Sequence, residues 1–214
     1  MKSIEKQFYL NTKKYFPDCT IDKERIMIVI LDDNEFLIEL SYKTFNLIGN
    51  EILEYYLIIS FKKIEEQWLM HREELMYPNS YPATIFLNIE NFIPEYYMYQ
   101  GLNLSKFEIY NYEEIFDKIH IEYTIPLIKK YSDINELDKI INPNDGNVQK
   151  GIRTNKIYPI RAVLVAQMSN NPRLPEITNE MRKYCKDSYE MGIKDSYVPA
   201  TKLLPVFEKM FGKE

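Results

Sequence analysis

The stretch Glu35-Phe-Leu-Ile-Glu-Leu-Ser-Tyr-Lys43 decides the fold class, because its apolar and polar residues alternate. Side chains on a strand point to the two faces of a sheet in turn. Phe36 and Tyr42 therefore fall on one face, whereas Glu35 and Glu39 fall on the other. This pattern predicts a β-strand with one face in the core and the other in solvent.

Three further segments extend this strand into an antiparallel meander. Ile26–Leu31 is apolar throughout, which predicts a strand covered on both faces. Asp32-Asp33-Asn34 supplies the turn between these two strands, because Asp and Asn tolerate the backbone of tight hairpins. A Gly49-Asn50 turn leads into a third strand over Ile52–Lys63, and a fourth is expected over Tyr81–Ile89. The short connections favour antiparallel pairing.

Helical periodicity flanks this meander. Ser3–Phe16 predicts an opening helix and Ile64–Met76 a helix after the third strand. From Asn111 to Tyr131 apolar residues recur every four positions, and a kink is expected at Pro126. Further helices are predicted over Asp133–Ile141, Lys156–Met168, Leu174–Met191 and Pro199–Phe211.

The predicted fold class is α+β. It consists of an opening helix, an N-terminal antiparallel meander of four to five strands and a helical C-terminal lobe. The sheet region is expected over residues 1–110 and the helical lobe over residues 111–214, packed as one continuous globular unit.

The composition indicates a protein with a packed core. The 214 residues are 45% hydrophobic and 14% aromatic, which argues against global disorder. No apolar run approaches the roughly 20 residues that span a bilayer, so no membrane contact is expected. The first residues lack the apolar core of a secretory signal. Cys19 and Cys185 are too few for a disulfide framework, and the expected location is the reducing cytoplasm.

The net charge of −5 is unevenly distributed along the chain. Residues 1–110 carry 11 Lys/Arg against 17 Asp/Glu, whereas residues 111–214 carry 16 against 15. An acidic first half repels phosphate backbones, so binding to nucleic acid is disfavoured.

No catalytic or cofactor signature stands out. His71 and His120 lack His or Cys neighbours at metal-ligand spacing. The segment from Gly146 to Gly151 begins like a phosphate-binding loop, but Ile152 and Arg153 follow where Lys and Ser/Thr are needed. Accordingly, no cofactor, no metal and no catalytic residue are predicted.

Two clusters are candidate protein-binding surfaces. The first contains the acidic residues Asp32, Asp33, Glu35 and Glu39, and the second contains Tyr96, Tyr97 and Tyr99. Acidic patches steer basic partners, and tyrosine is enriched at interaction hot spots. The alternatives are that the Asp side chains support the turn and that the tyrosines pack in the core.

These observations predict a non-catalytic, microbial protein-binding domain, of the type of an immunity or antitoxin inhibitor that captures a basic partner protein. The order of opening helix, meander and C-terminal helices resembles uncharacterised bacterial families found among immunity proteins. This resemblance extends over most of the chain and carries no diagnostic motif.

The alternative is an enzyme, or a protein that binds a small anion, with a site between the sheet and the helical lobe. Arg153 and Arg161 are the candidate ligand-binding residues, because a helix expected to start at Lys156 favours anions at its N-terminus.

Overall fold

The computed structural model describes residues 3–22, 27–76, 83–88, 92–93, 97–98, 101–106, 111–145, 152–153, 157–190 and 200–212. It confirms the α+β class, with an N-terminal helix, an antiparallel sheet and helices in the C-terminal half. Its contacts divide the chain into two compact units. Unit 1 comprises Met1–Ile59, Ile85–Ser132 and Lys150–Arg153, and unit 2 comprises Ser60–Thr84, Asp133–Gln149 and Thr154–Glu214. The division at residue 110 stays a prediction.

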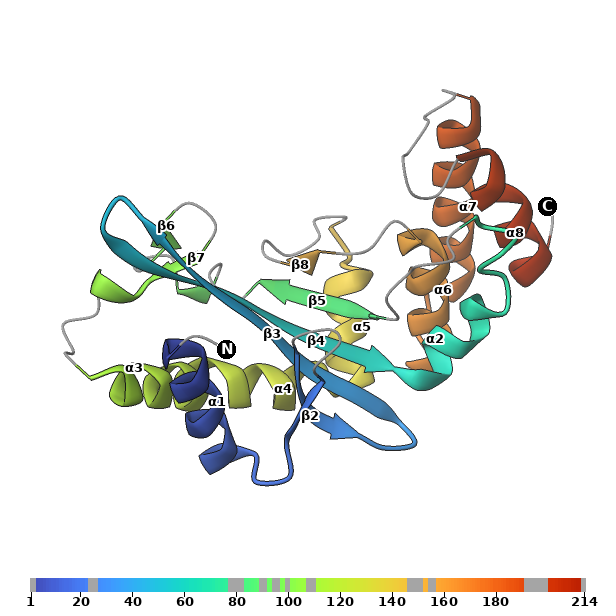
Figure 1. Cartoon of the computed structure of the whole chain (residues 1–214). Coiled ribbons are helices and arrows are strands. Elements are labelled where there is room, and N and C mark those ends of the chain that lie inside the picture. Colours follow the sequence, from blue (N-terminus) through green and yellow to red (C-terminus); the bar gives the residue numbers. More distant parts are fainter. Residues whose placement is uncertain are drawn as a thin grey trace. The chain divides into compact units, whose positions relative to one another are not determined.

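The sheet is built on the hairpin of β3 (Phe36–Leu47) and β4 (Asn50–Phe61), the longest strands of the described chain (Figure 1). The strand order is β1-β2-β3-β4-β5-β8, and β7 also pairs with β4 and carries β6. The added strands are β1 (Thr20–Asp22), β2 (Met27–Asp32), β5 (Ile85–Asn88), β6 (Tyr97–Met98), β7 (Gly101–Asn103) and β8 (Ile152–Arg153).

The turn that joins β3 to β4 is formed by Ile48 and Gly49, one residue earlier than predicted. Both residues have positive φ, 50° at Ile48 and 79° at Gly49. Two central residues with positive φ are the mark of a type I′ turn, whose twist matches that of the strands it connects.

The predicted core face of the two long strands is confirmed. Ile38, Leu40 and Tyr42 of β3 are buried, as are Tyr55 and Leu57 of β4. Strand β2 is less buried than predicted. Ile28 is buried, but the strand becomes exposed toward its end, where Leu31 is 38% exposed. A run of apolar residues does not show where along the strand its cover ends.

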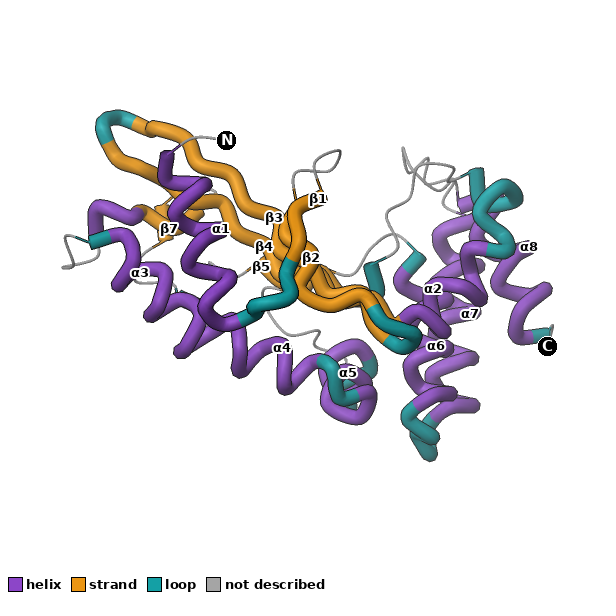
Figure 2. Tube along the Cα trace, turned by 60° about the horizontal axis from the view of Figure 1, so that its bottom comes forward, coloured by secondary structure: helices purple, strands orange, loops and turns teal. Residues whose placement is uncertain are grey.

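Helices α1 (Ser3–Tyr15) and α3 (Tyr112–Ile119) lie against one face of the sheet in unit 1 (Figures 1 and 2). Phe8 of α1 joins the two layers. Its ring centroid lies 4.9 Å from that of Tyr42, 5.3 Å from Tyr55 and 5.0 Å from Phe116. Such edge-on and tilted aromatic contacts stabilise a core beyond their buried area.

A π-helical turn, η4 (His120–Thr124), connects α3 to α4 (Ile125–Tyr131). A kink was predicted at Pro126, and the structure has this π-helical turn just before it. Pro126 has no N–H to donate to the preceding turn, and the N–H of Ile125 reaches back five residues to the carbonyl of His120. The Thr124 hydroxyl lies 3.2 Å from the carbonyl of Ile119 and occupies that acceptor. The short 3₁₀ helix η3 (Leu104–Lys106) precedes this segment.

Unit 2 is helical. Its elements are α2 (Lys62–Leu69), α5 (Ile134–Ile141), α6 (Tyr158–Met168), α7 (Leu174–Glu190) and α8 (Ala200–Phe211). The expected packing of the last three helices as neighbours is confirmed, because α7 contacts both α6 and α8. Helix α2 is shorter than predicted and gives way to turns from Met70 to Met76. In the described part of the chain, no helix has the length and apolar character needed to cross a membrane.

Glu65 of α2 is the polar centre of unit 2. Arg161 of α6 donates to its carboxylate from Nε, at 2.9 Å, and from Nη2, at 2.5 Å. Trp68 Nε1 and the Thr84 hydroxyl donate to the same carboxylate at 2.7 and 2.8 Å. Thr84 Oγ1 in turn accepts from the backbone N–H of Phe61. One carboxylate thus ties α2 to α6 and to the segment that precedes β5.

We predict that Glu65→Gln and Arg161→Met each lower the free energy of unfolding by about 3–5 kcal/mol, because each leaves a buried charge without its partner. Both side chains are almost fully buried, at 3% and 2% exposed. The double variant should lose about 1–3 kcal/mol less than the sum of the single losses. Urea denaturation measures all three.

The matched control is Glu66→Gln, the exposed neighbour on α2, which should change stability by less than about 0.5 kcal/mol. Strictly additive losses for Glu65→Gln and Arg161→Met would contradict the pairing.

Candidate functional site

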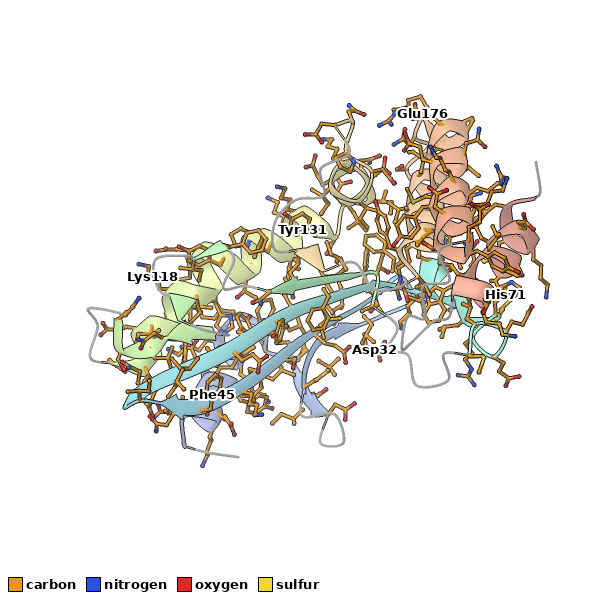
Figure 3. All side chains as sticks on the ribbon, turned by 90° about the horizontal axis from the view of Figure 1, so that it is seen from above. Asp32, Phe45, His71, Lys118, Tyr131 and Glu176 are labelled. Carbon is orange, nitrogen blue, oxygen red and sulfur yellow. The ribbon has the colours of Figure 1, made fainter. Side chains whose placement is uncertain are left out.

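The acidic turn between β2 and β3 is exposed. Asp32, Asp33 and Glu35 all lie at the surface, and Figure 3 places Asp32 at the opposite end of the β3 ribbon from Phe45. Asp33 also supports the turn, because its Oδ1 accepts from the backbone N–H groups of Glu35 and Phe36 at 2.7 Å each. The side chains of Asp32 and Glu35 take no part in these two hydrogen bonds.

Glu39 does not belong to this surface. Its side chain is 0% exposed, whereas the alternation of the sequence placed it on the solvent face. It pairs with Val29 of β2 in the register of the sheet. Alternation specifies the face to which a side chain points, but not whether that face is covered, and this was the reason for the wrong prediction.

The tyrosine cluster lies largely outside the described residues. Tyr96 and Tyr99 are not described, and Tyr97 is described only as a backbone position of β6. The same holds for Arg153, whose backbone lies in β8. Their roles in binding remain predictions.

Arg161 is committed to Glu65. Its guanidinium carbon also lies 5.2 Å from the centre of the Trp68 ring, and the side chain is 2% exposed. Arg161 Nη1 is the one nitrogen of this guanidinium without a hydrogen-bond partner among the described residues. The buried Glu65 carboxylate neutralises the positive charge of Arg161, so little of that charge is available to attract an anionic ligand.

His120 lies in a fully buried network of hydroxyl groups. The Thr12 hydroxyl donates to the carbonyl of Phe8 at 2.8 Å, so it accepts from His120 Nε2, at 3.1 Å. This assignment leaves Nδ1 without a proton, 3.2 Å from the Thr124 hydroxyl, whose own proton is directed at the carbonyl of Ile119. The Tyr55 hydroxyl lies 3.0 Å from Thr124. Burial lowers the pKa of His120 to about 4, against a small opposing effect of Asp117.

This network has the residue types of acid–base chemistry but no access to a substrate. His120 is 0% exposed, as is Thr124, and the neutral imidazole donates from Nε2 to the Thr12 hydroxyl. His71 differs in being near the surface, where Nδ1 lies 2.9 Å from Glu74 and Lys209 donates to the same carboxylate at 2.8 Å. These arrangements are typical of structural histidines.

Neither cysteine has the environment of a nucleophile. Cys19 and Cys185 are both buried. Burial raises the pKa of Cys19, and it raises the pKa of Cys185 to about 12. A reactive thiol needs the opposite shift, toward the thiolate.

A hollow of about 360 Å³ lies between α1 and the N-terminus of α3 in unit 1. Its lining residues are Gln7, Leu10, Asn11, Lys14, Asn111, Tyr112 and Glu113. Lys14 forms ion pairs with Glu113 and, at 3.7 Å, with Asp117. The hydrogen bond to Glu113 raises the pKa of Lys14. The two helices are thus joined by charged side chains along the edge of the hollow.

Asn11 is the buried polar residue of this hollow. Its Nδ2 donates to the Glu113 carbonyl at 3.2 Å and to Asp117 Oδ1 at 2.6 Å. Tyr15 also donates to Asp117 Oδ1, at 2.8 Å. Burial alone would raise the pKa of Asp117, but the hydrogen bonds from Asn11 and Tyr15 outweigh it and hold this pKa below its usual range. Asn11 Oδ1 is buried and has no partner in the described part of the protein.

A second hollow, of about 460 Å³, lies in unit 2 and is rich in asparagine. Its side chains are engaged with one another. Asp138 accepts from Asn142 at 2.7 Å and from Asn171 at 2.5 Å, and Arg173 donates to Asn144 at 2.9 Å. These bonds fasten the loop that precedes α7 to α5. This hollow is explained as a structural polar network.

No group of three or more His, Cys, Asp or Glu side chains among the described residues could hold a metal ion. The segment from Gly146 to Gly151 lies outside the described residues.

Comparison with known proteins assigns no family. No protein-family model matches the chain. No curated protein matches it, and no solved structure does.

Two features of the site were missed from the sequence. At the hollow, Asn11 contacts Glu113 and Asp117, which lie about 100 positions away in the sequence. No local sequence pattern predicts such a contact. The exposure of Ile48, by contrast, had a signal, because the residue before Gly49 in a hairpin turn is at the surface.

We predict that His120 makes folding stability depend on pH. The unfolded chain binds a proton near the ordinary pKa of 6.5, whereas the folded imidazole resists it down to about pH 4. Stability is therefore complete above about pH 6.5 and is lost as the pH falls toward 4, by about 3 kcal/mol in all.

Urea denaturation of the wild type and of His120→Asn across this pH range measures the effect. Because carboxylates titrate in both proteins, the quantity to compare is the difference between their free energies of unfolding. This difference should shrink as the pH falls. A difference that stays constant with pH would show that His120 is not held neutral.

Proposed function

We propose that this chain is a non-catalytic protein-binding module that captures a basic partner, in the manner of an immunity or antitoxin inhibitor. The observation that carries the proposal is Ile48. Its side chain is 82% exposed at the turn of the β3–β4 hairpin, and its φ is 50°. Figure 1 shows this turn extending beyond β6 and β7 at its end of the sheet.

Ile48 is unfavourable for the folded chain in two respects. A β-branched residue in the left-handed region destabilises the fold by about 1–2 kcal/mol, and Asn, Asp or Gly would avoid this strain. An exposed aliphatic side chain also gains nothing from burial. A residue that stabilises neither the turn nor the core is accounted for by contact with another molecule, for which a projecting apolar side chain is an anchor.

The acidic β2–β3 turn lies at the other end of β3 from Ile48, so a partner that contacts both turns must span the length of this strand. The turn supports the sign of that partner's charge. Asp32, Asp33 and Glu35 are exposed within four residues of one another. Such a concentration of carboxylates increases the encounter rate with a basic surface and repels an acidic one.

We predict that affinity capture with the tagged protein, from a lysate of its own source, recovers one basic protein in stoichiometric amount. The double variant Asp32→Lys/Glu35→Lys should lose it, because the steering charge is reversed. The variant Ile48→Asn should also lose it, because the apolar anchor is removed. Quantitative mass spectrometry measures the recovery.

The matched control is Glu122→Lys, an exposed carboxylate of η4 in the same unit, which should retain the partner. Asp33 is left unchanged so that the turn keeps its backbone hydrogen bonds. A partner that all three variants retain equally, or no enriched protein with the wild type, would refute the proposal.

A further inference from the structure

We propose that the hollow between α1 and α3 binds a neutral polyhydroxylated molecule, a single sugar ring. The proposal is independent of protein capture, because the residues that carry it lie on α1 and α3 and none of them belongs to a hairpin turn. The hollow of about 360 Å³ is near the lower end of the range for small-molecule pockets, which suits one ring.

The charges of the hollow point to a neutral ligand. Lys14 is paired with Glu113 and lies 3.7 Å from Asp117. An anionic ligand would have to displace Glu113 from Lys14, and a cationic ligand would have to displace Lys14. A neutral ligand binds while these pairs, which join the two helices, stay intact.

The groups left over are neutral hydrogen-bonding groups. The Gln7 amide and the Tyr112 hydroxyl make no hydrogen bond to other described residues. The side-chain oxygen of Asn111, Oδ1, caps α3 by accepting from the N–H of Glu113 at 2.9 Å, and the side-chain NH₂ group is left as a donor. Together these groups offer both donors and acceptors, as vicinal hydroxyls require.

The side-chain oxygen of Asn11 requires the ligand to carry a hydrogen-bond donor. Its amide cannot be flipped, because Nδ2 faces two acceptors, the Glu113 carbonyl and Asp117 Oδ1. Oδ1 is then a buried acceptor without a partner among the described side chains, in a residue that is 3% exposed and lines the hollow. Neighbouring atoms enclose Oδ1 in this structure, so a ligand hydroxyl, which is the size of a water molecule, reaches it only with a small shift of the Asn11 side chain; such a hydroxyl would give the buried acceptor its missing donor.

Two apolar side chains complete the match. Leu10 is 54% exposed at the hollow. The Tyr112 ring is held by stacking on Phe116, with centroids 6.1 Å apart and planes 19° apart. A sugar ring presents C–H groups on its faces and hydroxyls on its rim, so it can pack on these side chains while its rim meets the amides.

The test is titration of the full-length protein with the methyl glycosides of glucose, galactose, mannose and ribose, followed by amide NMR spectra. At least one should bind with a dissociation constant on the order of 1 mM. The shifts should be confined to the backbone amides of residues 7–14 and 111–113. The variants Gln7→Leu and Tyr112→Phe should each weaken binding by about tenfold, as expected for one lost hydrogen bond.

The matched control is Lys6→Leu, an exposed position next to Gln7 that does not line the hollow, which should leave the affinity unchanged. Glucosamine and glucose 6-phosphate serve as charged comparators and should bind no better than the neutral glycosides. The absence of binding by all four glycosides, shifts elsewhere, undiminished binding by both variants, or stronger binding of a charged comparator would overturn the proposal.

Discussion

The left-handed turn at Ile48 and Gly49 is the constraint on which the sheet depends. It sets the register of β3 on β4, and the remaining strands are added directly or through a neighbour to these two. Gly49 adopts its φ of 79° without strain, whereas Ile48 adopts 50° with a branched side chain. Because a shift of one residue would move every side chain to the opposite face, this turn also decides that Tyr42 and Tyr55 meet Phe8.

The side chains whose types are common in active sites, such as Glu65 and His120, stabilise the fold in this protein. In unit 2 the Glu65 carboxylate accepts four hydrogen bonds and joins α2 to α6. In unit 1 both ring nitrogens of His120 lie within 3.2 Å of hydroxyls from α1 and η4. The features that we propose for recognition lie at the surface, in the two hairpin turns and in the hollow beside Asn11.

The sequence predicted the fold class and most helices because periodicity is a local property. It also predicted that Asp33 would serve the turn. It failed at Glu39 and Leu31, because burial depends on what covers a strand and not on the strand itself. The pairing of Arg161 and the hollow at Asn11 depend on contacts between residues that are about 100 positions apart in the sequence. No pattern of sequence spacing predicts contacts over such a distance.

We propose that Ile48 is kept at the hairpin turn for contact with another molecule and at the expense of stability. The most direct test is the free energy of unfolding of Ile48→Asn, measured by urea denaturation beside the wild type. The variant creates Asn-Gly, the favoured sequence for this turn, so its stability should rise by about 1 kcal/mol. A stability equal to or below that of the wild type would show that Ile48 serves the fold, and would contradict the central claim.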